Sequence, residues 1–156
     1  MVTVIIPVYN GGRFLAEAIE SILHQSYTDI ELVIVNDGST NETEAIVRRY
    51  LQISEVPVKI HYLVQSNRGK AAAVNNALQQ AQGGYVTILD HDDIFPRTSI
   101  EKRVLLLETN PACVAVYGDA FLIDGKNRIY GKKNPGRLQL SLIYWAFSET
   151  RLPAVR

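Results

Sequence analysis

The segment Tyr85-Val86-Thr87-Ile88-Leu89-Asp90-His91-Asp92-Asp93 places an apolar, β-branched run directly before a cluster of carboxylates. Such a run is typical of a strand buried inside a sheet, and the aspartates begin where the run stops. In an open sheet of parallel strands, ligands bind beyond the carboxyl ends of the strands. The segment therefore predicts a binding site at a strand end.

The rest of the chain alternates apolar runs with segments of helical periodicity. We expect helices at residues 13–25, 45–50, 70–81 and 97–108, and strands at 2–6, 31–35, 57–63, 85–89 and 113–117. A hairpin around Asp124-Gly125 is expected to follow, with strands at 120–123 and 128–130. This order predicts an α/β fold with a mostly parallel sheet and helices on both faces.

Polar residues follow three of the expected strands at their carboxyl ends. Tyr9-Asn10 follows the first strand, Asp37-Gly38-Ser39 the second, and Asp90 to Asp93 the fourth. Because parallel strands end at the same edge of a sheet, we expect these groups to converge on one rim.

The carboxylates of Asp90, Asp92 and Asp93 repel one another unless a cation neutralises them. Hard divalent ions such as Mn²⁺ or Mg²⁺ prefer oxygen ligands and often bridge to substrate phosphates. A metal-bound diphosphate is a better leaving group. Alternation predicts that His91 faces away from the metal. The alternative is a solvated turn whose aspartates cap the helix expected after Pro96.

Asp37 and Lys70 are further candidates for ligand contacts. A carboxylate at a strand end can accept hydrogen bonds from a base or a ribose, and Gly38 permits close approach. The alternative is an Asx turn that feeds the next helix. Lys70 begins an expected helix, where a cation opposes the helix dipole unless an anion such as phosphate is present. Arg68 could serve equally, and a plain surface lysine is the alternative.

Composition excludes several classes. The 156 residues fit one domain, and 16 basic residues balance 16 acidic ones, so we expect no nucleic-acid partner. No apolar window reaches the roughly 20 residues of a membrane helix. Cys113, the one cysteine, forms no internal disulfide and is expected in the core. The fingerprints of dinucleotide-binding folds, P-loop NTPases and α/β-hydrolases are absent.

Four motifs in this order resemble the inverting family 2 glycosyltransferases. They are residues 4–10 (VIIPVYN), 34–40 (IVNDGST), 67–75 (NRGKAAAVN) and 88–93 (ILDHDD), and the resemblance covers about residues 2–125. It implies a Rossmann-like GT-A fold, a nucleoside-diphosphate sugar donor, most commonly a uridine one, and Mn²⁺ or Mg²⁺. By this resemblance the donor contacts are Pro7, Tyr9, Asp37, Arg68, Lys70, Asp90 and Asp92, and the metal ligands are Asp90, Asp92 and Asp93.

The resemblance also implies an organisation of the chain. Residues 1–130 would bind the nucleotide sugar, and residues 131–156 would begin the side that receives a glycan or lipid-linked acceptor. That segment holds a basic loop at 131–137 and an expected helix at 138–147. The family's catalytic base belongs to an acidic motif that does not occur before Arg156, so we expect donor binding with weak transfer. We therefore expect a cytoplasmic protein, with the inner membrane face as a further expected place of work.

Three alternatives remain open. The first is a binding module with the same fold and no chemistry. The second is a sugar nucleotidyltransferase, for which Asn10-Gly11-Gly12-Arg13 after the first strand is weak support. The third is a phospho-acceptor receiver domain, but its acidic pair belongs where this chain has Pro7-Val8-Tyr9-Asn10.

Overall fold

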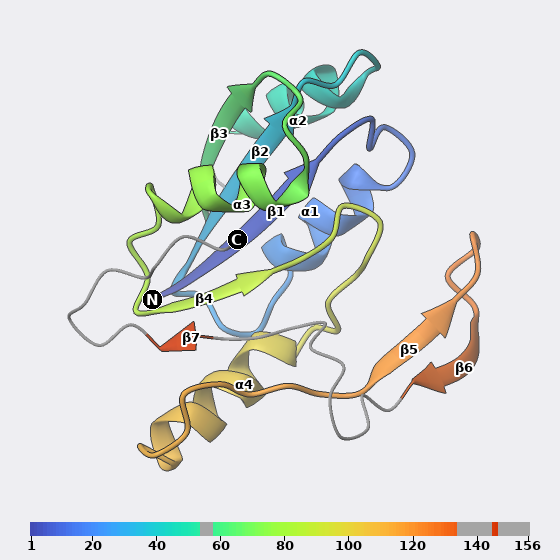
Figure 1. The fold of residues 1–156 in the computed structure, drawn as a ribbon. Helices are drawn as coiled ribbons and strands as arrows, with labels where there is room; N and C mark the ends of the chain where they lie inside the picture. The colour runs from blue at the N-terminus through green and yellow to red at the C-terminus, as the bar shows by residue number, and fades with distance from the viewer. Residues whose placement is uncertain (54–57, 134–144, 147–156) are drawn as a thin grey trace.

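The computed structural model describes residues 1–53, 58–133 and 145–146. Its centre is a five-stranded sheet in the order β3-β2-β1-β4-β7. The parallel strands are β1 (Val2–Val8), β2 (Ile30–Asp37), β3 (Lys59–Gln65) and β4 (Tyr85–Ile88). The predicted mostly parallel α/β sheet is therefore confirmed (Figure 1).

Helices cover both faces of the sheet, as predicted. They are α1 (Leu15–Leu23), α2 (Thr43–Leu51), α3 (Lys70–Leu78) and α4 (Ser99–Thr109). Alternate β1 residues point to opposite faces, so Ile6 joins the core formed with α1, α2 and α4, while Ile5 joins the core formed with α3. Because both faces are covered, every residue of β1 and β2 is buried. Figure 1 shows α3 in front of the sheet, with α1 and α2 behind it.

The first strand runs two residues further than predicted, through Pro7 to Val8. Ile5 accepts a backbone hydrogen bond from Leu89 on the β4 side, and Pro7, two residues on, faces the same side. The pairing of β1 with β4 ends at Ile5 and Ile88. The missing N–H of proline therefore removes no ladder hydrogen bond, and the strand continues.

The predicted strand at residues 113–117 is wrong. After α4 the chain turns, with the Cys113 N–H donating to the carbonyl of Asn110 (2.8 Å), and residues 113–117 pair with no strand among the described residues. Cys113 is exposed, so its predicted core position is also wrong. The apolar side chains of Val114 and Tyr117 are exposed as well. Apolar composition alone selected this segment, and composition does not provide a neighbouring strand.

The hairpin after this segment is confirmed. Strands β5 (Ala120–Ile123) and β6 (Ile129–Lys133) pair antiparallel, and Asp124 turns the chain by accepting hydrogen bonds from the backbone N–H groups of Lys126 and Arg128.

The helix predicted at 138–147 is wrong at Trp145–Ala146. These residues form β7, which pairs antiparallel with Tyr85 and Val86 of β4. Pairing with the free edge of β4 overrides local helical periodicity here. The remainder of the predicted helix lies outside the described residues. Among the helices that the structure describes, none has the length and apolar character needed to cross a membrane.

Candidate functional site

The loops after β1, β2 and β4 meet at the carboxyl edge of the sheet. They enclose a pocket of about 180 Å³. Its lining residues are Pro7, Val8, Tyr9, Asp37, Lys70, Ala73, Asp90, His91 and Asp92. The predicted convergence of the three strand ends is therefore confirmed. Of the predicted donor contacts, only Arg68 is not among the residues that line this pocket.

Side-chain hydrogen bonds join the first two loops. The Asn10 N–H donates to Ser39 Oγ (2.9 Å), and the Thr40 N–H donates to Asn10 Oδ1 (2.9 Å). Asn10 adopts a left-handed conformation (φ 54°), which asparagine tolerates better than most residues. These bonds fix the β1 loop against the β2 loop, and with it one wall of the pocket.

Asp37 ends β2 with its side chain almost fully buried (3% exposed). Its Oδ1 accepts hydrogen bonds from Gln65 Nε2 (2.8 Å) and the Arg68 N–H (2.9 Å), and its Oδ2 accepts one from the Gly69 N–H (2.8 Å). Burial raises the pKa of Asp37, but these hydrogen bonds and the Arg68 charge together outweigh it and lower the pKa below its ordinary value. The pocket therefore holds an ionised carboxylate.

Asp37 does not make the Asx turn considered for this loop, because its oxygens accept from Gln65, Arg68 and Gly69. Asn36, the residue before it, holds the loop instead by accepting at Oδ1 from the Ser39 N–H (2.8 Å). Asp37 instead reaches across to the loop after β3. Asp37 thus positions the residues that begin α3.

Lys70 and Asp90 form an ion pair at the pocket. Lys70 is the first residue of α3, and its Nζ lies 2.5 Å from Asp90 Oδ1. In this structure the anion beside Lys70 is the Asp90 carboxylate, not a phosphate. Both side chains stay partly exposed, so an incoming phosphate can approach the Lys70 ammonium.

The acidic cluster divides between two pockets. Asp90 and Asp92 line the pocket described above, whereas Asp93 lines a second one of about 440 Å³ between the following loop and the β5–β6 hairpin. Desolvation raises the pKa of Asp93, and the charges of Asp90 and Asp92 raise it further. Across residues 1–53, 58–133 and 145–146, no three His, Cys, Asp or Glu side chains are grouped closely enough to hold a metal.

His91 also lines the first pocket, although alternation predicted that it would face away from a metal there. The segment after β4 is a turn rather than a strand, with the Asp93 N–H donating to the Asp90 carbonyl (3.0 Å), so period-two alternation does not continue into it. The His91 ring lies against Gly11, where an added Cβ would come within 2.7 Å of it.

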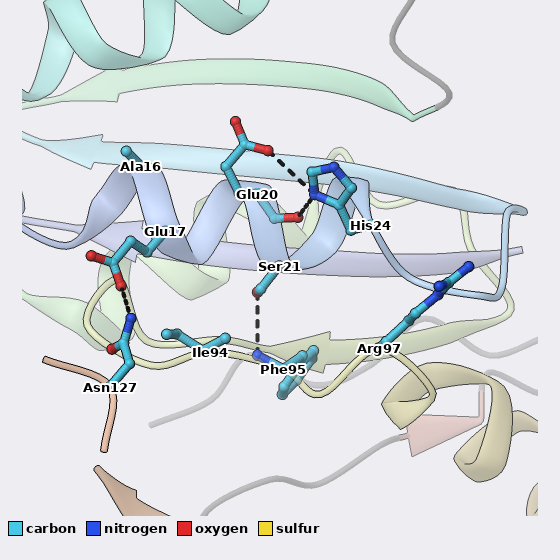
Figure 2. Close-up of a pocket in the computed structure, with 9 residues that line it drawn as sticks. All are labelled: Ala16, Glu17, Glu20, Ser21, His24, Ile94, Phe95, Arg97 and Asn127. Atoms are coloured by element: carbon cyan, nitrogen blue, oxygen red, sulfur yellow. Dashed lines mark hydrogen bonds and ion pairs between the residues drawn. The ribbon is translucent and has the colours of Figure 1, made fainter. Parts of the chain in front are cut away.

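A buried glutamine anchors the loop that follows the acidic cluster. Gln25, just after α1, donates to the Pro96 carbonyl (2.9 Å) and accepts from the Ile100 N–H (3.1 Å). Ser21 Oγ accepts from the Phe95 N–H (3.2 Å) beside it, as Figure 2 shows. These contacts fix the direction in which the chain leaves Asp93. Sequence reasoning missed Gln25, because its position after a helix carries no distinctive pattern.

Figure 2 also shows the pocket on the outer face of α1. Glu17 accepts a hydrogen bond from Asn127 of the hairpin loop (2.8 Å), and Glu20 pairs with His24 (3.3 Å). Glu17 and Glu20 thus have partners within the chain, and the Glu17 contact ties the hairpin to α1.

Gly38 is expected to tolerate no side chain. Its φ is +74°, and a Cβ would lie 2.7 Å from the backbone nitrogen of Asn67. Gly69 also has a positive φ (+85°), but nothing lies within 4 Å of a Cβ there. We expect Gly38→Ala to lower the free energy of unfolding by about 2–3 kcal/mol in urea denaturation, because the Asn67 contact adds to the backbone strain. Gly69→Ala should lower it by about 1–3 kcal/mol through strain alone, since its backbone (φ 85°, ψ 164°) lies in a region essentially reserved for glycine. A loss below about 1 kcal/mol in Gly38→Ala would contradict the contact with Asn67.

The chain matches the family model described as glycosyl transferase family 2 over residues 3–151. It is 40% identical over 128 residues to an uncharacterized glycosyltransferase of Rickettsia prowazekii, covering 81% of this chain and 38% of that protein. It is also 41% identical over 115 residues to glycosyltransferase GlyA of Streptococcus pneumoniae, covering 74% of this chain and 16% of that protein.

Two solved structures are similar in fold. The mannosyltransferase PcManGT from Pyrobaculum calidifontis, in complex with GDP-Man and Mn²⁺, has a TM-score of 0.68 and 35% identity over 73% of this chain and 34% of its own. S. aureus TarS in complex with UDP-GlcNAc has a TM-score of 0.62 and 29% identity over 70% of this chain and 32% of its own. This chain therefore spans well under half the length of these relatives.

The structural neighbours share the central parallel sheet flanked by helices, and the family model covers nearly the whole chain. The chain belongs to glycosyltransferase family 2 and has the GT-A fold.

Proposed function

We propose that the protein transfers a sugar from a nucleoside-diphosphate donor, a uridine one, to a glycan or lipid-linked acceptor, with inversion and with a divalent metal. The observation that carries this proposal is one pocket lined by Asp37 at the end of β2, by Lys70 at the start of α3, and by Asp90 and Asp92 after β4. An ionised hydrogen-bond acceptor suits a nucleobase, and a cation beside two carboxylates suits a metal diphosphate. The nucleotide sugars bound by PcManGT and TarS support the same donor class.

The donor would lie across the pocket with its nucleoside toward β1 and β2. Pro7 and the half-exposed ring of Tyr9 offer an apolar surface there, and Asp37 offers its carboxylate. The diphosphate would lie toward Lys70, whose ammonium is at the N-terminus of α3. Arg68 is not among the residues that line the pocket. Its exposed side chain belongs to the loop just before α3, from which it would contact the donor phosphates.

The residues present fit a metal of the Mg²⁺ or Mn²⁺ type. Such ions are commonly held by one or two carboxylates together with substrate phosphates and water, rather than by a complete protein cage. Asp90 and Asp92, which both line the donor pocket, would supply the carboxylates. Asp93, expected from the sequence as a third ligand, lines the second pocket instead and is left out of the metal site. When bound, the metal would neutralise charge on the departing diphosphate.

The second pocket is suited to the acceptor. It adjoins the donor pocket through the Asp90–Asp93 turn, and it combines the Phe95 and Phe121 rings with the Asp119 carboxylate. Aromatic faces and carboxylates are suited to the apolar faces and hydroxyl groups of a sugar. The residues that line this pocket all fall within 1–130, so the acceptor contacts proposed here begin before residue 131, where the sequence division placed the start of the acceptor side. A lipid-linked acceptor would bring the enzyme to the inner face of a membrane.

The test is a calorimetric titration of UDP with Mn²⁺ and, separately, with EDTA. We expect metal-dependent binding that Asp92→Ala weakens at least about tenfold, because the mutation removes a charged ligand. Asp29→Ala is the matched control, since Asp29 is exposed and pairs with the amino terminus. Binding that EDTA leaves unchanged would contradict the metal, and no binding of UDP, GDP or TDP would contradict the donor site. Turnover of a sugar 1-phosphate with a nucleoside triphosphate would instead support a nucleotidyltransferase.

A further inference from the structure

A chain of side-chain amides runs from α3 to the base-binding carboxylate. Asn76 Nδ2 donates to Gln65 Oε1 (2.9 Å), and Gln65 Nε2 donates to Asp37 Oδ1 (2.8 Å). Asn76 lies on α3, which is held to the sheet by the buried side chains of Ala73 and Ala77. Asn76 is therefore held in place by the packing of α3 on the sheet. Neither Gln65 nor Asn76 is among the residues that line the pocket.

The direction of these hydrogen bonds follows from the chemistry of the groups. An ionised carboxylate only accepts hydrogen bonds, so Gln65 must turn its NH₂ group toward Asp37. Its carbonyl oxygen then faces Asn76, which must donate. Asn76 thus holds Gln65 in the one orientation that serves Asp37.

The hydrogen bonds that described residues donate to Asp37 leave one of its acceptor positions open. A carboxylate offers about four lone-pair positions, two on each oxygen. Gln65 and the Arg68 N–H fill both positions on Oδ1, and the Gly69 N–H fills one on Oδ2. A ligand in the pocket therefore meets a single acceptor rather than a two-oxygen fork.

We propose that Gln65 and Asn76 are specificity-determining residues that restrict Asp37 to bases with a single imide N–H, namely uracil or thymine. This inference rests on the proposed binding of a nucleoside diphosphate. Uracil and thymine present one ring N–H between two carbonyls. Guanine presents a ring N–H beside an amino group, and this pair of parallel donors matches a carboxylate with one position open on each oxygen. Cytosine presents a ring acceptor, which the carboxylate repels.

The experiment measures the ratio of the dissociation constants for GDP and UDP, with Mn²⁺, on the 156-residue chain. Gln65→Met keeps an unbranched side chain of similar length but removes the donor, so a second position opens on Asp37 Oδ1. We expect wild type to prefer UDP, and the preference to fall about fivefold in Gln65→Met, which is the range of one hydrogen bond. Asn76→Leu should shift the ratio in the same direction by releasing Gln65. Gln80→Met, an exposed residue after α3, is the matched control and should leave the ratio unchanged.

The outcomes separate this inference from the proposed function. If UDP binds and the ratio stays the same in both variants, Gln65 and Asn76 have only a structural role and the inference is overturned, while the proposed function stands. A wild-type preference for GDP overturns it too. If wild type binds neither nucleotide, the proposed function itself fails. Thermal unfolding of each variant without nucleotide reports its folding, and Asn76→Leu provides the test if Gln65→Met does not fold.

Discussion

Asp37→Ala is expected to lower the free energy of unfolding by about 2–3 kcal/mol and to abolish nucleotide binding. The mutation removes the acceptor for Gln65 Nε2 and for the backbone N–H groups of Arg68 and Gly69. The hydrogen bonds from these two N–H groups are only partly buried, so water can replace the carboxylate there and limit the loss of stability. The loop that places Lys70 would lose its anchor. Urea denaturation and calorimetric titration of UDP measure the two effects.

The contribution of Asp37 should depend on pH in a defined direction. Its pKa is lower in the folded protein than the ordinary value of about 3.9, so its stabilisation is complete above about pH 4. As the pH falls through the folded pKa the carboxyl becomes protonated and the stabilisation is lost. Asp37→Asn cannot titrate, so its stability should fall less than that of wild type between pH 5 and pH 3. Parallel losses in the two proteins would contradict an ionised, hydrogen-bonded Asp37.

Most of the sheet could be predicted from local pattern because its strands are buried on both faces. Continuous apolar runs such as residues 32–35 have few other stable environments in a chain that also contains amphipathic helices. The three polar strand ends then followed from parallel order alone. This is why Asp37 and Asp90, far apart in sequence, could be expected at one pocket.

Local pattern failed where pairing depends on distant partners. Residues 113–117 are as apolar as a strand, but the described structure gives them no neighbour. Trp145–Ala146 shows the reverse case. The local periodicity predicts a helix there, but the two residues form a strand because they pair with the edge of β4. Whether an apolar segment forms a strand is decided by an available edge, and no local pattern reports that.

The amides that organise the site were also beyond prediction. Gln25, Gln65 and Asn76 have neutral side chains whose value depends on what lies opposite them in space. The importance of Gln65 becomes visible only when β3 is paired with β2, because Gln65 at the end of β3 then lies beside Asp37 at the end of β2. In-register parallel strands make these residues neighbours, so a correct sheet order would have identified the contact.

Glu31, near the start of β2, is expected to contribute strongly to stability. Glu31 is 1% exposed, and its Oε1 accepts hydrogen bonds from Thr3 Oγ1 (2.5 Å), the Gln82 N–H (2.5 Å) and the Gly83 N–H (3.1 Å). These bonds join β1, β2 and the turn into β4. We expect Glu31→Ala to lower the free energy of unfolding by about 3–4 kcal/mol, since it leaves buried donors without an acceptor.

Glu31→Gln should cost less than about 1 kcal/mol, because only Oε1 of Glu31 has hydrogen-bond partners. Oε2 has none, and it lies 3.7 Å from His61 Nε2, which is also without one. Glutamine keeps the Oε1 acceptor and turns a donor toward His61, so it removes a buried charge without removing a hydrogen bond. Urea denaturation of both variants tests this, and a glutamine loss as large as the alanine loss would mean that a charged Glu31–His61 pair is required. UDP affinity should stay unchanged in both, since the donor pocket lies at the far end of β2, roughly 20 Å away along the strand.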